Sequence, residues 1–211
     1  MPSLIVIGAG GHAQMVISTA LAAGFEIDCV LDDNPQRWGQ RILGIVIDGP
    51  IAKACDKRST PAVIAIGDGA ARRRIAGEFA LNWTRLVHPF AYVDPAAQVG
   101  EGTVIAAGGI VQPGAVIGKH CVVNTGSSID HDCRLEDYVT TGPGVHLAGG
   151  VHVGTGTLLG VGSCARPGCR IGAESQVGAG AVVIQDLPSH VVAYGVPARI
   201  RQTNEQAKRV A

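Results

Sequence analysis

The sequence predicts an α/β domain followed by a solenoid of short β-strands, and two observations lead to this prediction. In the first 90 residues, aliphatic segments that read as strands alternate with a helical pattern, which is typical of a parallel sheet covered by helices. From Val93 to Val183, aliphatic residues recur at every sixth position, a period that neither a helix nor a flat strand produces. A chain of 211 residues is long enough for two such domains, each with its own core.

The first domain is expected to contain three parallel strands with ligand-binding residues at their carboxyl ends. The strands are predicted at residues 4–8, 27–31 and 62–66, and an amphipathic helix is predicted at residues 14–23. Glycines and aspartates follow the strands, as Gly8 to Ala13 (GAGGHA), Asp32-Asp33-Asn34 and Gly67-Asp68.

The glycine run favours a nucleotide, because glycine lets backbone N–H groups approach phosphate oxygens at the start of a helix. Gly8, Gly10 and Ala13 formally fit the dinucleotide fingerprint, with Asp32 about 20 residues further on. A full dinucleotide fold uses two mononucleotide halves, however, and only about 85 residues precede the repeat. A single nucleotide carrying a sugar therefore fits better than NAD.

The six-residue repeat covers nearly half of the chain. Of the sixteen positions reached in steps of six from Val93, fourteen are aliphatic and seven are followed by glycine. Short strands that turn at regular intervals produce this pattern, because each turn returns one aliphatic side chain to a shared interior. Cys121, Cys133 and Cys169 stand two positions before the aliphatic one, in a slot of small residues, so we expect them to be buried fillers.

Composition argues against several classes of function. Lys plus Arg (17) balance Asp plus Glu (17), whereas a domain that grips nucleic acid or an anionic membrane usually has a basic excess. Residues 138–165 contain no charged residue of these four types, but their eight glycines and period of six argue against a membrane helix. No signal peptide is expected, and six cysteines without a C-x-x-C pair indicate a reducing compartment. We therefore expect a cytoplasmic protein without nucleic-acid or membrane partners.

The repeat resembles that of the hexapeptide-repeat acyltransferases. The resemblance implies a left-handed parallel β-helix of triangular section, in which three hexads make one 18-residue coil and the sixteen hexads make about five coils. Members of this family usually form trimers, so a homotrimer with active sites between subunits is expected. Residues 195–199 (GVPAR) are similar to the G-x-P-A-[RK] ending of the same enzymes, which lies near CoA.

The two halves together resemble the bacterial nucleotide-sugar acetyltransferases over nearly the full length. The likeness is greatest to the UDP-4-amino-sugar N-acetyltransferases of glycan synthesis, with sialic-acid-pathway O-acetyltransferases and perosamine N-acetyltransferases as relatives. It implies acetyl-CoA-dependent acetylation of the 4-amino group of a nucleotide-linked amino sugar, with UDP as the expected nucleotide and no metal. The implied domains are a Rossmann-like nucleotide-sugar-binding domain (1–88), a left-handed β-helix acyltransferase domain (89–186) and a C-terminal extension (187–211).

The segment NTGSSIDHDC, residues 124–133, is similar to the family pattern N-T-x-x-x-[IV]-x-H-[DE]-C. The resemblance makes His131 the catalytic base and Asp132 the residue that raises its basicity. A protonated amine has no lone pair, and a histidine with a pKa near about 6.5 can remove its proton at neutral pH. Asn124 is a candidate for orienting the substrate, although an asparagine at a turn is equally well explained by structure alone.

The remaining site residues follow from the same likeness. Asp32 and Asp33 are expected to meet the ribose or base, and the glycines and His12 the phosphates and their surroundings. The predicted substrate-binding residues are Gly10, Gly11, His12, Asp32, Asp33 and Gly67. The predicted acetyl-CoA-binding residues are Thr140, Gly149, Val161 and Ala179.

Gly149 and Thr140, two of the residues predicted to bind acetyl-CoA, are each expected to contribute in a different way. Gly149 stacks over the His131 corner and would leave room for a pantetheine arm. Thr140 stands where the family usually has a second histidine that contacts acetyl-CoA, and its hydroxyl can still donate a hydrogen bond but cannot carry charge.

Three other functions stay open. The same scaffold could O-acetylate a sugar such as a sialic acid. One class of carbonic anhydrase uses a hexapeptide β-helix with zinc-binding histidines five residues apart, but no His-x4-His occurs here, which argues against that site. A non-catalytic nucleotide sensor would bind the nucleotide without turnover.

Overall fold

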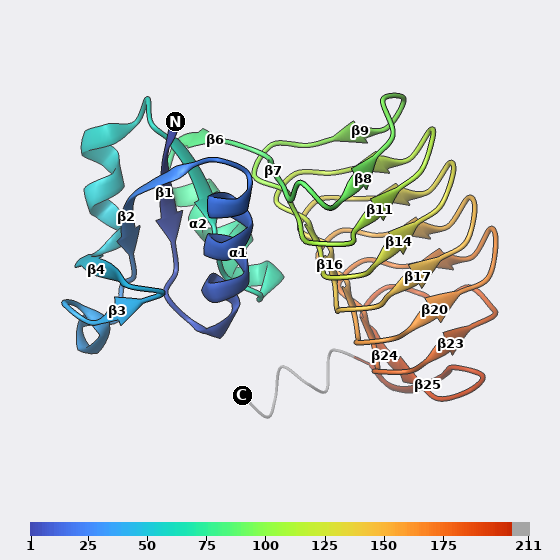
Figure 1. Ribbon diagram of the computed structural model, residues 1–211. Helices are drawn as coiled ribbons and strands as arrows, with labels where there is room; N and C mark the ends of the chain where they lie inside the picture. The colour runs from blue at the N-terminus through green and yellow to red at the C-terminus, as the bar shows by residue number, and fades with distance from the viewer. Residues whose placement is uncertain (204–211) are drawn as a thin grey trace.

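The computed structural model describes residues 1–203, which form an α/β domain and a triangular β-helix (Figure 1). The α/β domain is built on a six-stranded sheet in the order β3-β4-β2-β1-β5-β6, parallel except for the β3–β4 pair. Its strands are β1 (Ser3–Ile7), β2 (Glu26–Leu31), β3 (Arg41–Ile42), β4 (Ile45–Gly49), β5 (Pro61–Ile64) and β6 (Asn82–Trp83). Its helices are α1 (Gly11–Ala22), α2 (Gly69–Glu78) and two short 3-10 segments, η1 (Pro35–Arg37) and η2 (Ile51–Lys57).

Helices cover both faces of this sheet, which explains why strand β1 is apolar along most of its length. Leu4 and Val6 pack in the cluster that contains α1, whereas Ile5 and Ile7 pack on the other face with Ile75 of α2. The three predicted strands and the predicted first helix are confirmed, with ends that differ by up to three residues.

The second part is a parallel β-helix in which strands from β7 to β23 pair with the strand 18 residues further on, as Val104 does with Val122. The first sheet contains β7 (Leu86–Val87), β10 (Val104–Ile105), β13 (Val122–Val123), β16 (Thr140–Thr141), β19 (Leu158–Leu159), β22 (Gln176–Val177), β24 (Val191–Tyr194) and the antiparallel β25 (Arg199–Thr203). The second sheet contains β8 (Tyr92–Val93), β11 (Ile110–Val111), β14 (Ser128–Ile129), β17 (His146–Leu147), β20 (Cys164–Ala165) and β23 (Val182–Val183). The third sheet contains β9 (Gln98–Val99), β12 (Val116–Ile117), β15 (Arg134–Leu135), β18 (His152–Val153) and β21 (Arg170–Ile171).

Three rows of turns join these sheets and run along the edges of the triangle. The first corner joins the first sheet to the second and includes residues 124–127, 142–145, 160–163 and 178–181. The second corner joins the second sheet to the third and includes residues 112–115, 130–133, 148–151 and 166–169. The third corner joins the third sheet back to the first and includes residues 118–121, 136–139, 154–157 and 172–175.

One aliphatic side chain from each short strand fills the interior of the triangle. Cys121, Cys133 and Cys169 are buried there, as their slot in the repeat predicts, and Cys29 is buried in the first domain, whereas Cys55 and Cys164 are partly exposed. Thr141 replaces an aliphatic residue, and its buried hydroxyl lies 3.2 Å from the Val122 carbonyl oxygen and 3.2 Å from the Ser127 hydroxyl.

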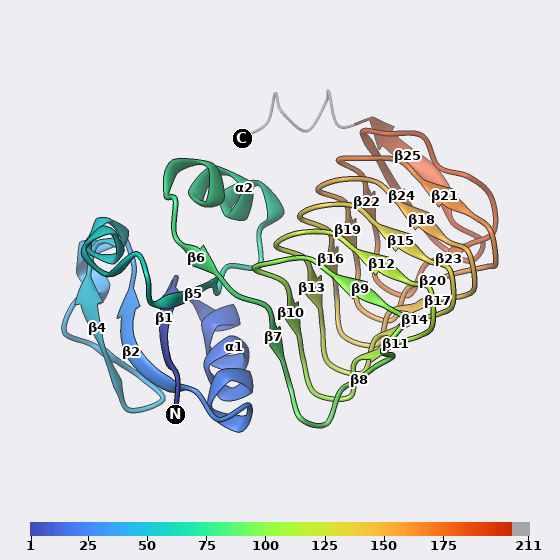
Figure 2. The same ribbon diagram turned by 90° about the horizontal axis from the view of Figure 1, so that it is seen from above.

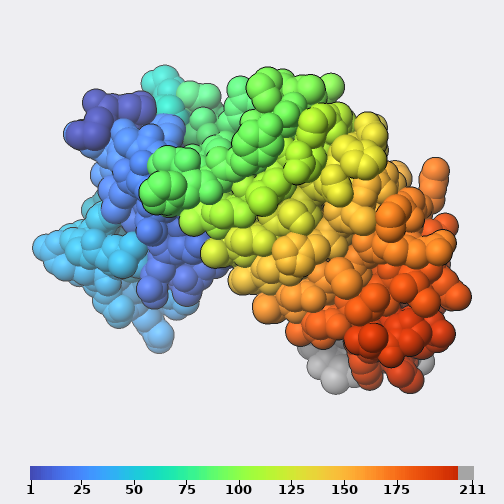
Figure 3. Space-filling model, turned by 45° about the vertical axis from the view of Figure 1, so that its right-hand side comes forward, coloured from blue at the N-terminus to red at the C-terminus, as the bar shows by residue number. Residues whose placement is uncertain are grey.

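The α/β domain packs against the first sheet, and the second corner lies on the opposite side of the β-helix (Figures 1 and 2). Leu86 of β7 and Val104 of β10 point outward and belong to the same apolar cluster as helix α1. Figure 3 shows the α/β domain seated against the first coils, while the later coils extend beyond it.

The predicted fold class, a Rossmann-like α/β domain followed by a β-helix, is confirmed. The domain boundaries stay predictions. The first stacked strand, β7, begins two residues before the predicted boundary at 88, and β24 continues the first sheet beyond 186. Residues 204–211 of the predicted C-terminal extension lie outside the described residues. No helix within residues 1–203 is long and apolar enough to cross a membrane.

Candidate functional site

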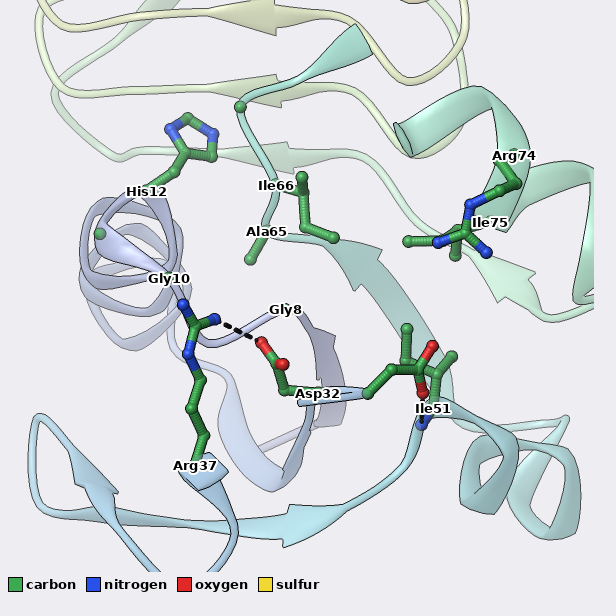
Figure 4. A pocket seen from close by; sticks show the side chains of 13 residues that line it. Gly8, Gly10, His12, Asp32, Arg37, Ile51, Ala65, Ile66, Arg74 and Ile75 are labelled. Atoms are coloured by element: carbon green, nitrogen blue, oxygen red, sulfur yellow. Dashed lines mark hydrogen bonds and ion pairs between the residues drawn. The ribbon is translucent and has the colours of Figure 1, made fainter. Parts of the chain in front are cut away.

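A cavity of about 390 Å³ opens at the carboxyl ends of β1, β2 and β5 (Figure 4). The chain leaves β1 through Gly8, whose φ of +101° suits glycine and whose missing side chain leaves room for Ile66. The six predicted substrate-binding residues all line this one cavity: Gly10, Gly11, His12, Asp32, Asp33 and Gly67.

Asp32 holds the loops around the cavity together. Its carboxylate accepts hydrogen bonds from the backbone N–H of Ala9 (2.8 Å) and of Asn34 (2.8 Å), and it pairs with Arg37 (2.8 Å). Burial alone would raise the pKa of this carboxyl group, but the hydrogen bonds from Asn34, Ala9 and Arg37 outweigh burial and lower it. Asp32 is therefore anionic and already has three donors.

Asp33 is more exposed and has a simpler environment. One carboxylate oxygen accepts a hydrogen bond from the backbone N–H of Ile51 at 2.9 Å, which ties the start of η2 to the end of β2 (Figure 4). Among the described residues no side chain donor contacts its second oxygen, so this oxygen can accept from a ligand.

Sequence reasoning missed several residues that line the cavity. Arg37 and Arg74 place two guanidinium groups on its walls, and Ile51, Ile66 and Ile75 supply apolar surface (Figure 4). Arg37 lies near the glycine-rich loop and pairs with Asp32, whereas Arg74 lies across the cavity on α2 and pairs with Glu78 at 3.1 Å. Guanidinium groups at these places suit a phosphate, and apolar walls suit a base or sugar ring. The arginines carry no local signal, because each stands in a turn or helix where a solvated arginine is the usual case.

His12 lies at the start of α1 and its ring packs beside Gly67. Its Nε2 is buried and has no hydrogen-bond partner in the described part of the chain. Burial, and then the positive charge of Arg72, lower the pKa of His12 to about 4. His12 is therefore neutral at physiological pH in the ligand-free protein.

His131 and Asp132 form an exposed pair at the second corner. The Nδ1 atom of His131 lies 2.9 Å from a carboxylate oxygen of Asp132, and the two side chains are 62% and 75% exposed. The hydrogen bond to Asp132, and then the charge of Asp130, raise the pKa of His131. Because an ionised carboxylate can only accept, Nδ1 carries the proton in the neutral ring and Nε2 has the free lone pair.

Two glycines make room for this pair. A Cβ atom on Gly149, in the next coil, would overlap the His131 ring, and one on Gly114, in the previous coil, would lie 2.6 Å from a carboxylate oxygen of Asp132. The imidazole of His131 thus lies directly against Gly149, and the contact of Gly149 with acetyl-CoA stays a prediction. Asp132 itself has a φ of +58°, a left-handed conformation that aspartate tolerates better than most residues.

Asn124, Val161 and Ala179 lie at the first corner, not beside His131. A corner occurs every six residues, so a residue seven positions before His131 belongs to a different edge of the triangle. Adjacent corners are separated by one side of the triangle, roughly 15 Å at the rise of a β-strand. Val161 and Ala179 are exposed and stacked one coil apart, and the Asn124 carboxamide oxygen accepts from the backbone N–H of Thr125 at 2.8 Å.

Thr140 lies in a third place, the junction between the domains, where it is 8% exposed. The centre of this junction is Arg72 of α2, which is 1% exposed and forms no ion pair with the described residues. Burial lowers the pKa of Arg72 to about 10. Its guanidinium donates to carbonyl oxygens of both domains and to the hydroxyl of Thr140 at 2.8 Å.

The ring of His120 packs beside this arginine at the third corner. It stacks on Tyr138, with centroids 5.5 Å apart, and meets the edge of Trp83 at 5.1 Å. Burial, and then the charge of Arg72, lower the pKa of His120 to about 4. Within residues 1–203 no cluster of His, Cys, Asp or Glu has the arrangement of a metal site.

The β-helix carries an exposed histidine–aspartate pair and is joined to a domain with a nucleotide-sized cavity. These two features are typical of the class of acyltransferases that have a separate nucleotide-binding domain. Residues 3–79 match the family described as the PglD N-terminal domain. The structure is similar to perosamine N-acetyltransferase from Caulobacter crescentus, solved with CoA and GDP-perosamine (37% identity, 96% of this chain and 98% of that one, TM-score 0.89). It is also similar to the acetyltransferase domain of PglB from Neisseria gonorrhoeae FA1090, solved with acetyl coenzyme A (32% identity, 94% and 98% coverage, TM-score 0.87).

Three further similar proteins carry less information. WeeI from Acinetobacter baumannii AYE shares the fold at 22% identity, with a TM-score of 0.85. Galactoside O-acetyltransferase from Escherichia coli (strain K12) is 51% identical over 43 residues, and an uncharacterized protein of Acanthamoeba polyphaga mimivirus is 33% identical over 101 residues. The chain spans about a fifth of the length of these curated relatives.

The chain belongs to the hexapeptide-repeat nucleotide-sugar acetyltransferases. This conclusion rests on perosamine N-acetyltransferase and the acetyltransferase domain of PglB, each of which is more than 30% identical and is matched over almost its whole length.

Proposed function

We propose that the protein transfers the acetyl group of acetyl-CoA to the 4-amino group of a nucleotide-linked amino sugar. Family membership makes it an acetyl-CoA-dependent acetyltransferase. The observation that carries the proposal is the His131–Asp132 pair, whose geometry leaves Nε2 as a free base on an exposed corner.

The reaction needs one proton transfer to a base. The amine nitrogen forms a bond with the thioester carbonyl carbon while Nε2 of His131 takes a proton from that nitrogen. The C–S bond then breaks, and the CoA sulfur leaves as a thiolate that receives the proton. Asp132 stabilises the imidazolium formed in between, because its carboxylate already holds Nδ1–H at 2.9 Å.

A trimer with shared sites would bring the cavity and the base together. In one chain the α/β domain covers the first sheet, and Figure 2 shows the corner between β14 and β15 on the opposite edge of the triangle. His131 belongs to this corner, so the β-helix separates it from the α/β domain. We propose that the second corner of one copy faces the α/β domain and first corner of the next. Acetyl-CoA would then run between Gly149 of one copy and Val161 and Ala179 of the other.

Complementation tests this arrangement. The His131→Ala variant lacks the base, and Gly10→Leu fills the cavity, because a side chain at Gly10 points toward Arg37. Each variant alone is expected to be inactive, and co-expression of the two is expected to restore activity in mixed trimers. Light scattering should show a trimer; a monomer, or no activity in the mixture, would refute the shared site.

The nucleotide and the acceptor can be decided by direct assays. The sequence resemblance favours UDP, and a relative solved with GDP-perosamine makes GDP the second candidate. A thermal-shift screen of UDP, GDP and dTDP, alone and as nucleotide sugars, should give one clear stabilisation. Thiol release should then require the amino sugar. Faster release with the matching hydroxyl sugar would favour O-acetylation, and binding without thiol release would favour a sensor.

The cytoplasm is the proposed location. Its support is that all six cysteines are free thiols in the structure, as expected in a reducing compartment.

A further inference from the structure

Arg72 connects the two domains through hydrogen bonds from all three of its side-chain nitrogens. On the α/β side, Nη1 donates to the carbonyl oxygens of Ile66 at 3.0 Å and Gly67 at 2.8 Å. On the β-helix side, Nε donates to the carbonyl oxygen of His120 at 2.8 Å, and Nη2 donates to that of Tyr138 at 2.9 Å. A planar guanidinium with five N–H groups in fixed directions can serve these acceptors at once, which a lysine cannot do.

The Thr140 hydroxyl closes this set of hydrogen bonds. It accepts from Nη2 of Arg72 at 2.8 Å and lies 3.3 Å from the carbonyl oxygen of Gly67. Because arginine can only donate, the single hydroxyl proton is directed to the Gly67 oxygen. The hydroxyl therefore has no proton left for the acetyl carbonyl of acetyl-CoA, and its side chain is buried at the domain junction.

The carbonyl groups held in this way belong to the wall of the nucleotide cavity. Ile66 and Gly67 line it directly after strand β5, and Gly67 also contacts the ring of His12. The orientation of this wall relative to strand β16 thus depends on Arg72 and Thr140. Burying the charge of Arg72 without a carboxylate partner costs free energy of folding. Stability therefore does not account for this arginine, whereas its effect on the relative orientation of the two domains does.

We propose that Arg72, Thr140 and the Gly67 carbonyl form a latch that positions the nucleotide cavity on the β-helix. Arg72 and Thr140 are positioning residues. Thr140 acts by holding the latch closed and not by contacting acetyl-CoA. The inference rests on the proposed function only in that its kinetic readout uses the nucleotide sugar.

Thr140→Val is the test, because valine keeps the volume of threonine and removes the hydroxyl. The expected result is a KM for the nucleotide sugar raised roughly tenfold, the size of one hydrogen bond to a charged group, with the KM for acetyl-CoA unchanged. Thr140→Ser keeps a hydroxyl and should restore the wild-type KM. Arg72→Lys should raise the same KM further; if that variant does not fold, the valine–serine comparison decides alone.

Arg73→Met is the matched control. Arg73 is the next residue of α2 and also bridges the domains, through a pair with Glu174 (2.6 Å) whose side chains are 43% and 35% exposed and a cation–π contact 5.2 Å from the centre of the Tyr138 ring. Exposed contacts of both kinds contribute little, so the KM for the nucleotide sugar should stay within about twofold.

The outcomes separate the latch from the proposed function. A rise in the KM for acetyl-CoA alone in Thr140→Val, reversed by serine, would overturn the latch and return Thr140 to cofactor binding. Equal wild-type kinetics in both threonine variants would also overturn it. If no nucleotide sugar is turned over by wild type, the function fails but the latch is still tested. With Trp38 replaced by Phe, the fluorescence of Trp83 then reports the junction during denaturation, and Thr140→Val should separate its transition from that of the β-helix.

Discussion

His131 at the second corner and His120 at the domain junction show how the same side chain takes opposite electrostatic properties in one β-helix. His131 is exposed, has Asp132 at 2.9 Å and Asp130 nearby, and has a raised pKa. His120 is 2% exposed, lies between Trp83 and Tyr138 near Arg72, and has a pKa lowered to about 4. Burial and the sign of the neighbouring charge, not the repeat position, decide which histidine can act as a base.

The largest expected effect is the loss of activity when His131 is replaced. His131→Ala should lower kcat/KM roughly 10²–10⁴-fold, the usual contribution of a positioned base, with both KM values nearly unchanged. His152→Ala is the matched control, because His152 forms another histidine–carboxylate pair, with Glu136 at 3.0 Å, on the third sheet. Near-wild-type turnover by His131→Ala from pH 6 to 9 would place the base elsewhere.

Gly149→Ala tests whether the position of the His131 ring matters. A methyl group there would overlap the imidazole and push it away from its present place. Activity should fall roughly ten- to a hundredfold, as expected for a displaced catalytic group, with no loss of folded structure. Gly77→Ala in α2 meets no atom within 4 Å and should leave activity unchanged. Unchanged steady-state kinetics in Gly149→Ala would contradict the assigned ring position.

The buried histidines should make stability depend on pH. His12 and His120 titrate near 4 in the folded chain and near 6.5 when unfolded, so between these values the unfolded chain binds more protons. Stability is therefore full above pH 6.5 and is lost as pH falls toward 4. The free energy of unfolding should fall by on the order of 2 kcal/mol per histidine between pH 6.5 and 5.

Chemical denaturation monitored by the fluorescence of the two tryptophans, Trp38 and Trp83, measures this dependence. In His120→Asn, which cannot titrate and tolerates the φ of +51° at this position, the fall with pH should be about half that of wild type. An equal fall in the variant would show that His120 is not responsible.

The smallest expected effect is a displaced pH–rate profile. Asp132→Asn keeps the shape of the side chain and removes the charge that raises the pKa of His131. The histidine then loses its proton at lower pH, so the acidic limb of the kcat/KM profile should move to lower pH. A move to higher pH, or none, would exclude Asp132 as the source of the raised basicity.

Much of the fold was predictable because its cause is local and repeated. The six-residue period requires that each hexad return one aliphatic side chain to the interior, and the structure keeps this register over the whole repeat. The glycine run and the aspartates after β2 likewise predicted a cavity at the carboxyl ends of the strands. His131 could be singled out because it stands in the segment NTGSSIDHDC, residues 124–133, which is similar to the family pattern.

The junction was not predictable, because the sequence does not say which side of a helix will dock. Three consecutive arginines of α2 look alike in the sequence but have different surroundings. Arg72 lies in the buried latch, Arg73 forms an exposed interdomain ion pair, and Arg74 lies on the wall of the cavity. Only the packing of α2 against the third corner separates them.

The sequence by itself determined the β-helix, the glycine-rich loop after β1 and the charged segment that contains His131, since each depends on neighbouring residues in the chain. The tertiary structure alone decided how the two domains meet, that the Thr140 hydroxyl is engaged by Arg72, and that His131 lies across the β-helix from the cavity of its own chain. The physical reason is that contacts between residues far apart in sequence, such as Arg72 and Thr140, depend on docking geometry, which no local pattern encodes.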